Sequence, residues 1–214
     1  MTRKLLIVAA LTACVAASAQ AQLCAGSASF SAGRMRAGVS AEFPTGGKAY
    51  GAGLTWSHRS GAYFGGQIMR QDPTGAAESA TDLQANVGYQ TSFDGLGKIR
   101  FCPTGHFGIT NLPNNQESVT HYALGGTFGE ALSSSENMTL APSLGVSWVH
   151  YSSGGVSDSW VEATIGAGFI FNGDVTFTPM LRLPLNQDGA DPTFAVSLMY
   201  NFGRPGVTGG RRRR

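Results

Sequence analysis

Apolar residues alternate with small or polar residues along most of this chain. In the segment TFAVSLMYNFG, residues 193–203, every even-numbered position is apolar, whereas the odd-numbered positions hold Thr, Ala, Ser, Met, Asn and Gly. A period of two residues is that of a β-strand, whose successive side chains point to opposite faces. The pattern recurs along the chain and predicts ten strands, near 27–44, 48–58, 61–71, 82–93, 98–110, 119–130, 137–151, 158–171, 174–184 and 193–203.

The predicted strands are long, and the connections between them alternate in length. Most strands have about ten residues, which a tilted strand needs to cross a bilayer, whereas strands of soluble sheets average about 5–6. Short turns on one side of a sheet and longer loops on the other are typical of a transmembrane β-barrel. We therefore predict an all-β, antiparallel, up-and-down transmembrane barrel of ten strands, with eight or twelve as alternatives and both termini in the periplasm. The predicted turns lie at 58–61, 94–97, 133–136 and 172–174, the longer loops at 72–81, 111–118, 152–157 and 185–192, and the short connection 44–47 departs from the alternation.

The residue types on the polar side of the predicted strands indicate whether the apolar side faces lipid or a protein core. It is rich in Gly, Ala, Ser and Thr, which suits a narrow barrel interior where volume is scarce, and aromatic residues on the apolar side lie near strand ends, as at membrane interfaces. We expect the apolar side to face lipid, with a soluble periplasmic β-sandwich as the competing interpretation. The charged residues on the polar side would line the lumen, either as a buried ion-pair network or as the wall of a very narrow channel. They are Arg34, Arg36, Glu42, Lys98, Arg100, Glu162 and Arg182.

The first residues have the pattern of a secretory signal peptide. Arg3 and Lys4 precede the apolar run Leu5–Ala13, and small residues within 17–21 match a cleavage site. We predict cleavage near residues 19–21, with lipidation at Cys14 as the alternative. The predicted organisation is a signal peptide at 1–21, a barrel at 22–203 and a basic, disordered tail at 204–214.

Charge is unevenly distributed along the sequence. The formal net charge is +2, and six of the 15 basic residues lie at the two ends: Arg3, Lys4 and Arg211 to Arg214. This distribution does not indicate a nucleic-acid partner, and the terminal arginines could contact anionic lipid heads by charge alone. Acidic residues in the expected outer loops could bridge to lipopolysaccharide through divalent cations, or could simply be solvated. They are Asp72, Glu78, Asp82, Glu117, Asp158, Asp188 and Asp191.

The last predicted strand carries a family resemblance. Val196, Leu198, Tyr200 and Phe202 resemble the final strands of bacterial outer-membrane proteins, which the barrel-assembly machinery reads, although here residues 203–214 follow the last aromatic residue. The mature chain resembles the small outer-membrane β-barrel superfamily, the outer membrane protein beta-barrel domain. The resemblance implies an outer-membrane location in a Gram-negative bacterium, contact with lipid and lipopolysaccharide, and a structural, adhesion-type or narrow-channel role.

One short motif could carry catalysis. His150-Tyr151-Ser152 resembles the His-x-Ser motif of outer-membrane lipid A deacylases, in which the His is the base for the Ser nucleophile. Asp158 or Glu162 would then orient the His. Ser153 stands where that family has Asn, and Glu162 is on the lumen side, so we interpret the motif as a polar rim and expect no catalysis.

Cysteine and histidine suggest structural roles. With the signal removed, Cys24 and Cys102 remain, and we predict a disulfide that draws the N-terminal segment into the lumen, with two free thiols as the alternative. His58, His106 and His121 lack metal-ligand spacing, so neither a metal nor another cofactor is expected. The glycine pairs Gly51/Gly53 and Gly166/Gly168 suit close packing in the lumen rather than phosphate binding.

Overall fold

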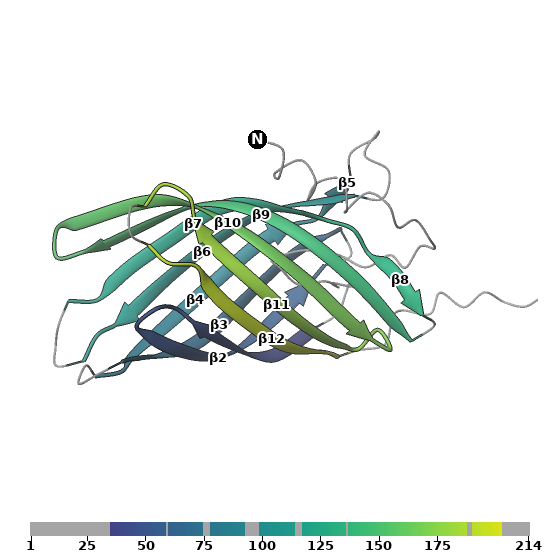
Figure 1. Cartoon of the computed structure of the whole chain (residues 1–214), viewed down its shortest axis with the longest axis horizontal. Coiled ribbons are helices and arrows are strands. Elements are labelled where there is room, and N and C mark those ends of the chain that lie inside the picture. Colours follow the sequence, from purple (N-terminus) through teal and green to yellow (C-terminus); the bar gives the residue numbers. More distant parts are fainter. Residues whose placement is uncertain are drawn as a thin grey trace, which may run out of the picture.

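The computed structural model describes residues 35–202, except for 59, 75–77, 93–98, 114–116, 136 and 188–189. All of its strands belong to one antiparallel sheet that curves into a strongly tilted barrel (Figure 1). No helix in the described part is long and apolar enough to cross a membrane. The strands are β1 (Met35–Phe43), β2 (Gly47–Ser57), β3 (Ala62–Pro73), β4 (Ala80–Tyr89), β5 (Thr91–Ser92), β6 (Arg100–Asn111), β7 (Val119–Gly129), β8 (Leu132–Ser135), β9 (Met138–Ser153), β10 (Val156–Phe171), β11 (Val175–Pro184) and β12 (Thr193–Phe202).

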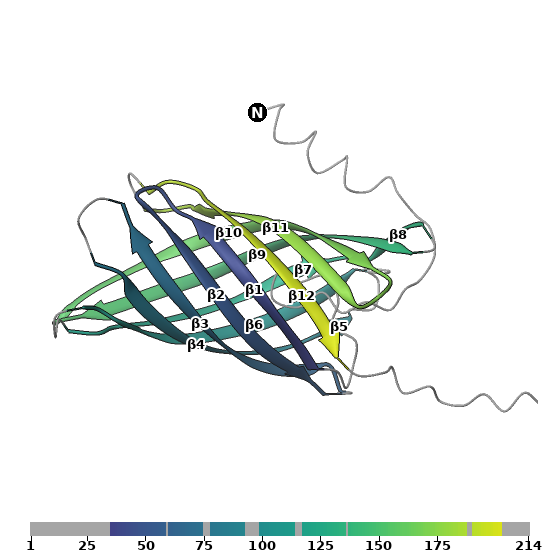
Figure 2. The ribbon, with the colours of Figure 1, turned by 90° about the horizontal axis from the view of Figure 1, so that it is seen from below.

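The first and last strands close the barrel. β1 pairs with β2 on one side and with β12 on the other, from Met35 opposite Phe202 to Phe43 opposite Phe194 (Figure 2). Closure leaves the ten long strands without an open edge, which is what a sheet in hydrocarbon requires. The prediction of an up-and-down barrel of ten strands is confirmed, and the alternative of a two-sheet sandwich is wrong because there is a single closed sheet.

Two short strands extend the long ones at one end of the barrel. β5 follows β4 and pairs with the start of β6, while β8 follows β7 and pairs with the start of β9. In both views they lie at the end where β1 begins and β12 finishes, which we name the terminal end; the opposite end is the loop end. The turn predicted at 133–136 is therefore displaced, because strand pairing continues to Ser135. The turn predicted at 94–97 lies outside the described residues.

The β9–β10 hairpin at the loop end corrects the prediction of a longer loop at 152–157. Ser153 pairs with Val156, and only Gly154 and Gly155 lie between the strands, with φ angles of 57° and 80°. Two consecutive residues with positive φ make the tight turn whose twist matches that of paired strands. As a result β9 and β10 have 16 residues each, more than any other strand.

The two faces of each strand differ sharply in exposure. On β12, Leu198 and Tyr200 are 50% and 48% exposed, whereas Ser197 and Asn201 are 6% and 4% exposed. Outward residues are therefore the apolar ones, and the buried positions hold small and polar side chains. This arrangement is the reverse of a soluble protein and matches a barrel whose solvent is lipid.

Candidate functional site

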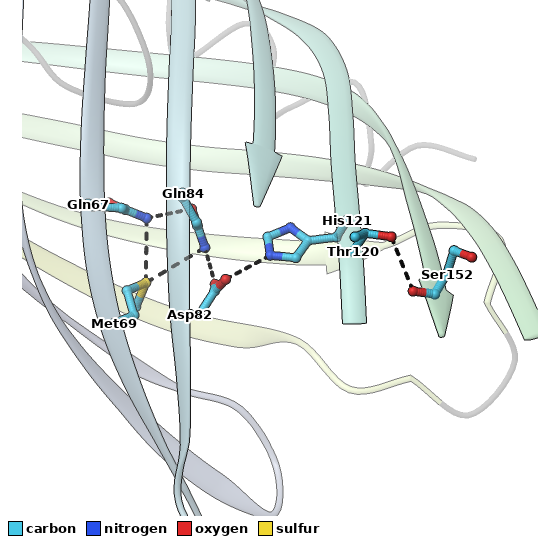
Figure 3. Close-up of polar contacts among 7 residues, drawn as sticks. All are labelled: Gln67, Met69, Asp82, Gln84, Thr120, His121 and Ser152. Carbon is cyan, nitrogen blue, oxygen red and sulfur yellow. Dashed lines mark hydrogen bonds and ion pairs between the residues drawn. The ribbon is translucent and has the colours of Figure 1, made fainter. Parts of the chain in front are cut away.

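An acid–base pair lies on the inner wall of the barrel near the loop end. His121 on β7 and Asp82 on β4 lie 2.9 Å apart between Nε2 and Oδ1, although β6 separates their strands (Figure 3). Gln84 donates a hydrogen bond to Asp82, and Gln67 donates one of 2.6 Å to Gln84. Asp82 is only 2% exposed, so its carboxylate depends on these partners rather than on water.

A stack of rings continues this polar row. His121 stacks on Tyr151 of β9 with ring centroids 5.1 Å apart, and Tyr151 stacks on Trp160 of β10 at 5.0 Å and 10°. The three rings occupy adjacent positions on the inner wall of β7, β9 and β10. Bulky planar side chains therefore project into the lumen on this side.

A second charged group faces the stack. Arg182 on β11 forms an ion pair with Glu42 on β1, across the intervening β12. Glu162 on β10 lies within electrostatic range of both. Tyr151 interacts electrostatically with Arg182, Glu162 and Glu42 and also with Asp82. We name the set Glu42, Gln67, Asp82, Gln84, His121, Tyr151, Trp160, Glu162 and Arg182 the lumen network.

The structure places the predicted lumen charges as follows. Glu42, Glu162 and Arg182 belong to the lumen network, whereas Arg36 lies at the terminal end of β1 and is 4% exposed. Arg100 begins β6 and is half-buried on the same side as Cys102. Arg34 and Lys98 lie outside the described residues.

Several of the acidic residues expected in the outer loops belong to strands. Asp82 was expected in an outer loop, but it is a buried residue of β4 because its strand begins at Ala80. Asp72 belongs to β3 and pairs with Arg70 at 3.0 Å, while Asp158 belongs to β10 and accepts a hydrogen bond from the backbone of Ser159. Within the described ranges, no group of three or more His, Cys, Asp or Glu side chains could hold a metal ion. Asp188 lies outside them.

The His150-Tyr151-Ser152 motif has a different geometry from a catalytic triad. His150 Nδ1 lies 2.7 Å from the hydroxyl of Ser159, the residue opposite it on β10, while the backbone carbonyl of Ser152 accepts a hydrogen bond from Thr120. Alternate residues of a strand are about 6.6 Å apart, so His150 and Ser152 do not come together by spacing alone. The proposed orienting residues Asp158 and Glu162 are on the inner side of β10, away from His150. Sequence reasoning missed Ser159, since cross-strand register is needed to find it.

Cys102 is fully buried on the inner side of β6. It lies near the terminal end, because β6 begins there at Arg100. Cys24 lies outside the described residues, as do the signal peptide and the basic tail, so the predicted disulfide stays a prediction. The glycine pair Gly51/Gly53 does serve close packing: a Cβ on Gly51 would lie 2.7 Å from Met69 Cγ, and one on Gly53 would lie 3.1 Å from Gln67 Cβ.

Comparison with known proteins identifies the fold. No protein-family model matches the sequence, and no curated protein matches it. Among solved structures, the β domain of the Bordetella autotransporter Brka is similar, with a TM-score of 0.55 and 12% identity over 80% of this chain and 100% of that domain. The KdgM porin gives a TM-score of 0.43 at 7% identity over 78% of this chain and 99% of the porin. An outer membrane channel from Pseudomonas putida F1 gives 0.43 at 10% identity over 88% of this chain and 100% of the channel. Together with the apolar outer surface, the first similarity identifies the fold as that of outer-membrane β-barrels.

Proposed function

We propose that this chain, an integral outer-membrane β-barrel protein, is a structural or adhesion-type barrel whose lumen is closed by its own side chains. The alternative within the same class is a very narrow channel. The two differ in whether a continuous aqueous path crosses the barrel.

The lumen network is the observation that carries the proposal. Its members come from β1, β3, β4, β7, β9, β10 and β11, so they are distributed around most of the inner wall rather than along one side of it. Barrels of about eight strands have interiors that side chains can fill, whereas open channels occur at about 16–18 strands. A barrel of ten strands that contains stacked rings and paired charges is closer to the small barrels whose interiors are filled by side chains.

The β9–β10 hairpin supports a role at the cell surface. β10 pairs with β11 only as far as Glu162, so residues 156–161 and the part of β9 that pairs with them extend past the end of β11 at the loop end. The tip of the hairpin is open to contact, because the side chain of Val156 is 75% exposed. A paired hairpin on a closed barrel is suited to presenting a surface rather than to transporting a solute.

Single-channel recording tests the proposal. Refolded protein is inserted into planar bilayers, with an established porin in the same bilayers as the positive control. Insertion is verified separately by the different gel migration of unboiled and boiled samples. We expect no conductance steps above the bilayer background. Reproducible steps from protein that passes the migration test would overturn the closed-barrel proposal in favour of the channel.

A further inference from the structure

Two histidines occupy matching positions at opposite ends of the apolar outer surface. His58 follows Trp56 by two residues where β2 leaves the barrel at the terminal end, and His150 follows Trp148 by two residues where β9 reaches the loop end. The ring centroids are 5.7 Å apart in the first pair and 5.8 Å apart in the second. Neither histidine belongs to the lumen network.

Each imidazole is held in the same way. His58 Nδ1 lies 3.0 Å from the hydroxyl of Ser60, and His150 Nδ1 lies 2.7 Å from the hydroxyl of Ser159. Tyr122 adds a further ring beside His150, with centroids 4.8 Å apart. In both cases Nδ1 is the nitrogen that is engaged, and Nε2 has no hydrogen-bond partner among the residues that the structure describes.

The two positions fall at the borders of the apolar belt. From Trp148 toward the terminal end, the next outward residues of β9 are Val146 and Leu144, each 50% exposed. Because tryptophan favours the membrane–water interface, Trp148 marks the border of this apolar stretch. The opposite border on β2 is marked by Lys48, whose amino group lies 5.6 Å from the ring centroid of Tyr50. From Lys48 to His58 there are ten residue steps, which at about 3.3 Å per residue and a tilt of about 40° give a height of about 25 Å. This height equals that of the apolar band of such barrels, so the imidazoles lie at headgroup depth, one in each leaflet.

We propose that His58 and His150 each bind the phosphate of a membrane lipid headgroup. The backbone N–H of Ser60 donates to Nδ1 of His58 at 3.2 Å, which leaves the ring proton on Nε2, and in the proposed state the hydroxyl of Ser159 donates to Nδ1 of His150 with the same result. Nε2 then donates to a phosphate oxygen, which can only accept. Beside His150 on the outer face of β10, Ser157 offers a hydroxyl to a phosphate, whereas the hydroxyl of Thr120 donates to the carbonyl of Ser152 and that of Ser159 contacts Nδ1 of His150. The proposal rests on the membrane-spanning barrel and is independent of whether the lumen conducts.

Nitrogen NMR of the histidine rings tests this in the wild-type protein. The protein, labelled with ¹⁵N histidine and ¹⁵N tryptophan, is prepared in dodecyl maltoside micelles and titrated with lysophosphatidylglycerol. The control titration uses a monoacylglycerol with the same acyl chain, which lacks the phosphate. We expect saturable shifts of Nε2 in His58 and His150 with the phospholipid only, while His106 and His121 in the lumen do not move.

The variant His150→Gln locates the effect. It should abolish the phospholipid-dependent shift of the Trp148 indole and leave that of Trp56 unchanged, and His58→Gln should do the reverse. Equal shifts with the monoacylglycerol, equal shifts of all four histidines, or no shift of His58 and His150 would each overturn the proposal.

Discussion

The imidazole of His121 lies over the α-carbon of Gly108 on the neighbouring strand. The two residues are opposite each other in the β6–β7 register, and a Cβ on Gly108 would stand 2.3 Å from Cε1 of His121. Only by passing over this position does the ring reach Asp82 on β4. The absence of a side chain on β6 therefore permits an acid–base pair between two strands that are not neighbours.

Replacing Gly108 by Ala should break that pair. The His121 ring cannot simply move aside, because Tyr151 stacks on it and Asp82 forms a hydrogen bond with it. We therefore expect the substitution to lower the free energy of unfolding by about 1–3 kcal/mol. Urea unfolding in detergent, followed by tryptophan fluorescence, measures the loss. Gly105→Ala on the same strand is the matched control, since its Cβ would meet Leu124 and Val87 at an ordinary 3.5 Å. Equal stability of both variants would contradict the prediction.

The energetic coupling between Asp82 and His121 can be measured by a double-mutant cycle. Asp82→Asn and His121→Gln each keep a polar group but remove the charge-assisted bond, and each should cost about 1–3 kcal/mol of unfolding free energy. Since the two residues are in contact, the double variant should lose less than the sum, with a coupling of about 0.5–3 kcal/mol. If the losses of unfolding free energy in the two single variants add up to that of the double variant, the interaction between Asp82 and His121 contributes nothing to stability.

The fold was largely predictable from the sequence because a barrel in lipid obeys one simple rule. Each long strand must alternate strictly between apolar and small or polar residues, and the predicted strand at 193–203 agrees with β12 to within one residue. The loop at 152–157 was mispredicted, although Gly154-Gly155 is itself a hairpin signal. Polar Ser and Asp residues flanking the turn masked the continuation of β9 and β10.

The lumen network was predictable only in part. Alternation assigns Glu42, Glu162 and Arg182 to the inner side, but the choice of partners depends on the stagger between strands, which a single sequence does not carry. Asp82 is opposite Thr110 and His121 is opposite Gly108, so the pair that forms is diagonal. A glycine opposite a large inward residue is the one sequence signal that could have indicated such a crossing.

The last strand offers a test of assembly. Phe202 and Phe194 are outward residues of β12, 48% and 46% exposed, at its opposite ends. If the final aromatic residue is read during assembly, Phe202→Ala should reduce the amount of heat-modifiable barrel in outer membranes severalfold, while Phe194→Ala should not. Quantitative blotting of unboiled membrane samples measures this. Equal yields of folded barrel from both variants would show that Phe202 is not recognised during assembly.

The predicted Cys24–Cys102 disulfide can be detected directly. Cys102 is fully buried near the terminal end, and exported proteins commonly oxidise their cysteine pairs. Mass spectrometry of a non-reduced digest should yield a linked peptide containing both residues, and reduction should separate it. Labelling of both thiols without prior reduction would refute the disulfide.

The ring stack should be the barrier that closes the lumen at the loop end. Tyr151 contacts His121 on one side and Trp160 on the other, so replacing both Tyr151 and Trp160 by Ala removes two of the three rings in this stack. We expect conductance steps in planar bilayers from this variant and none from the wild type. Tyr122→Ala is the matched control, because Tyr122 neighbours His121 on β7 but faces outward and is 38% exposed. If the double variant passes the gel-migration test for folding but gives no conductance steps, the stack is not the barrier.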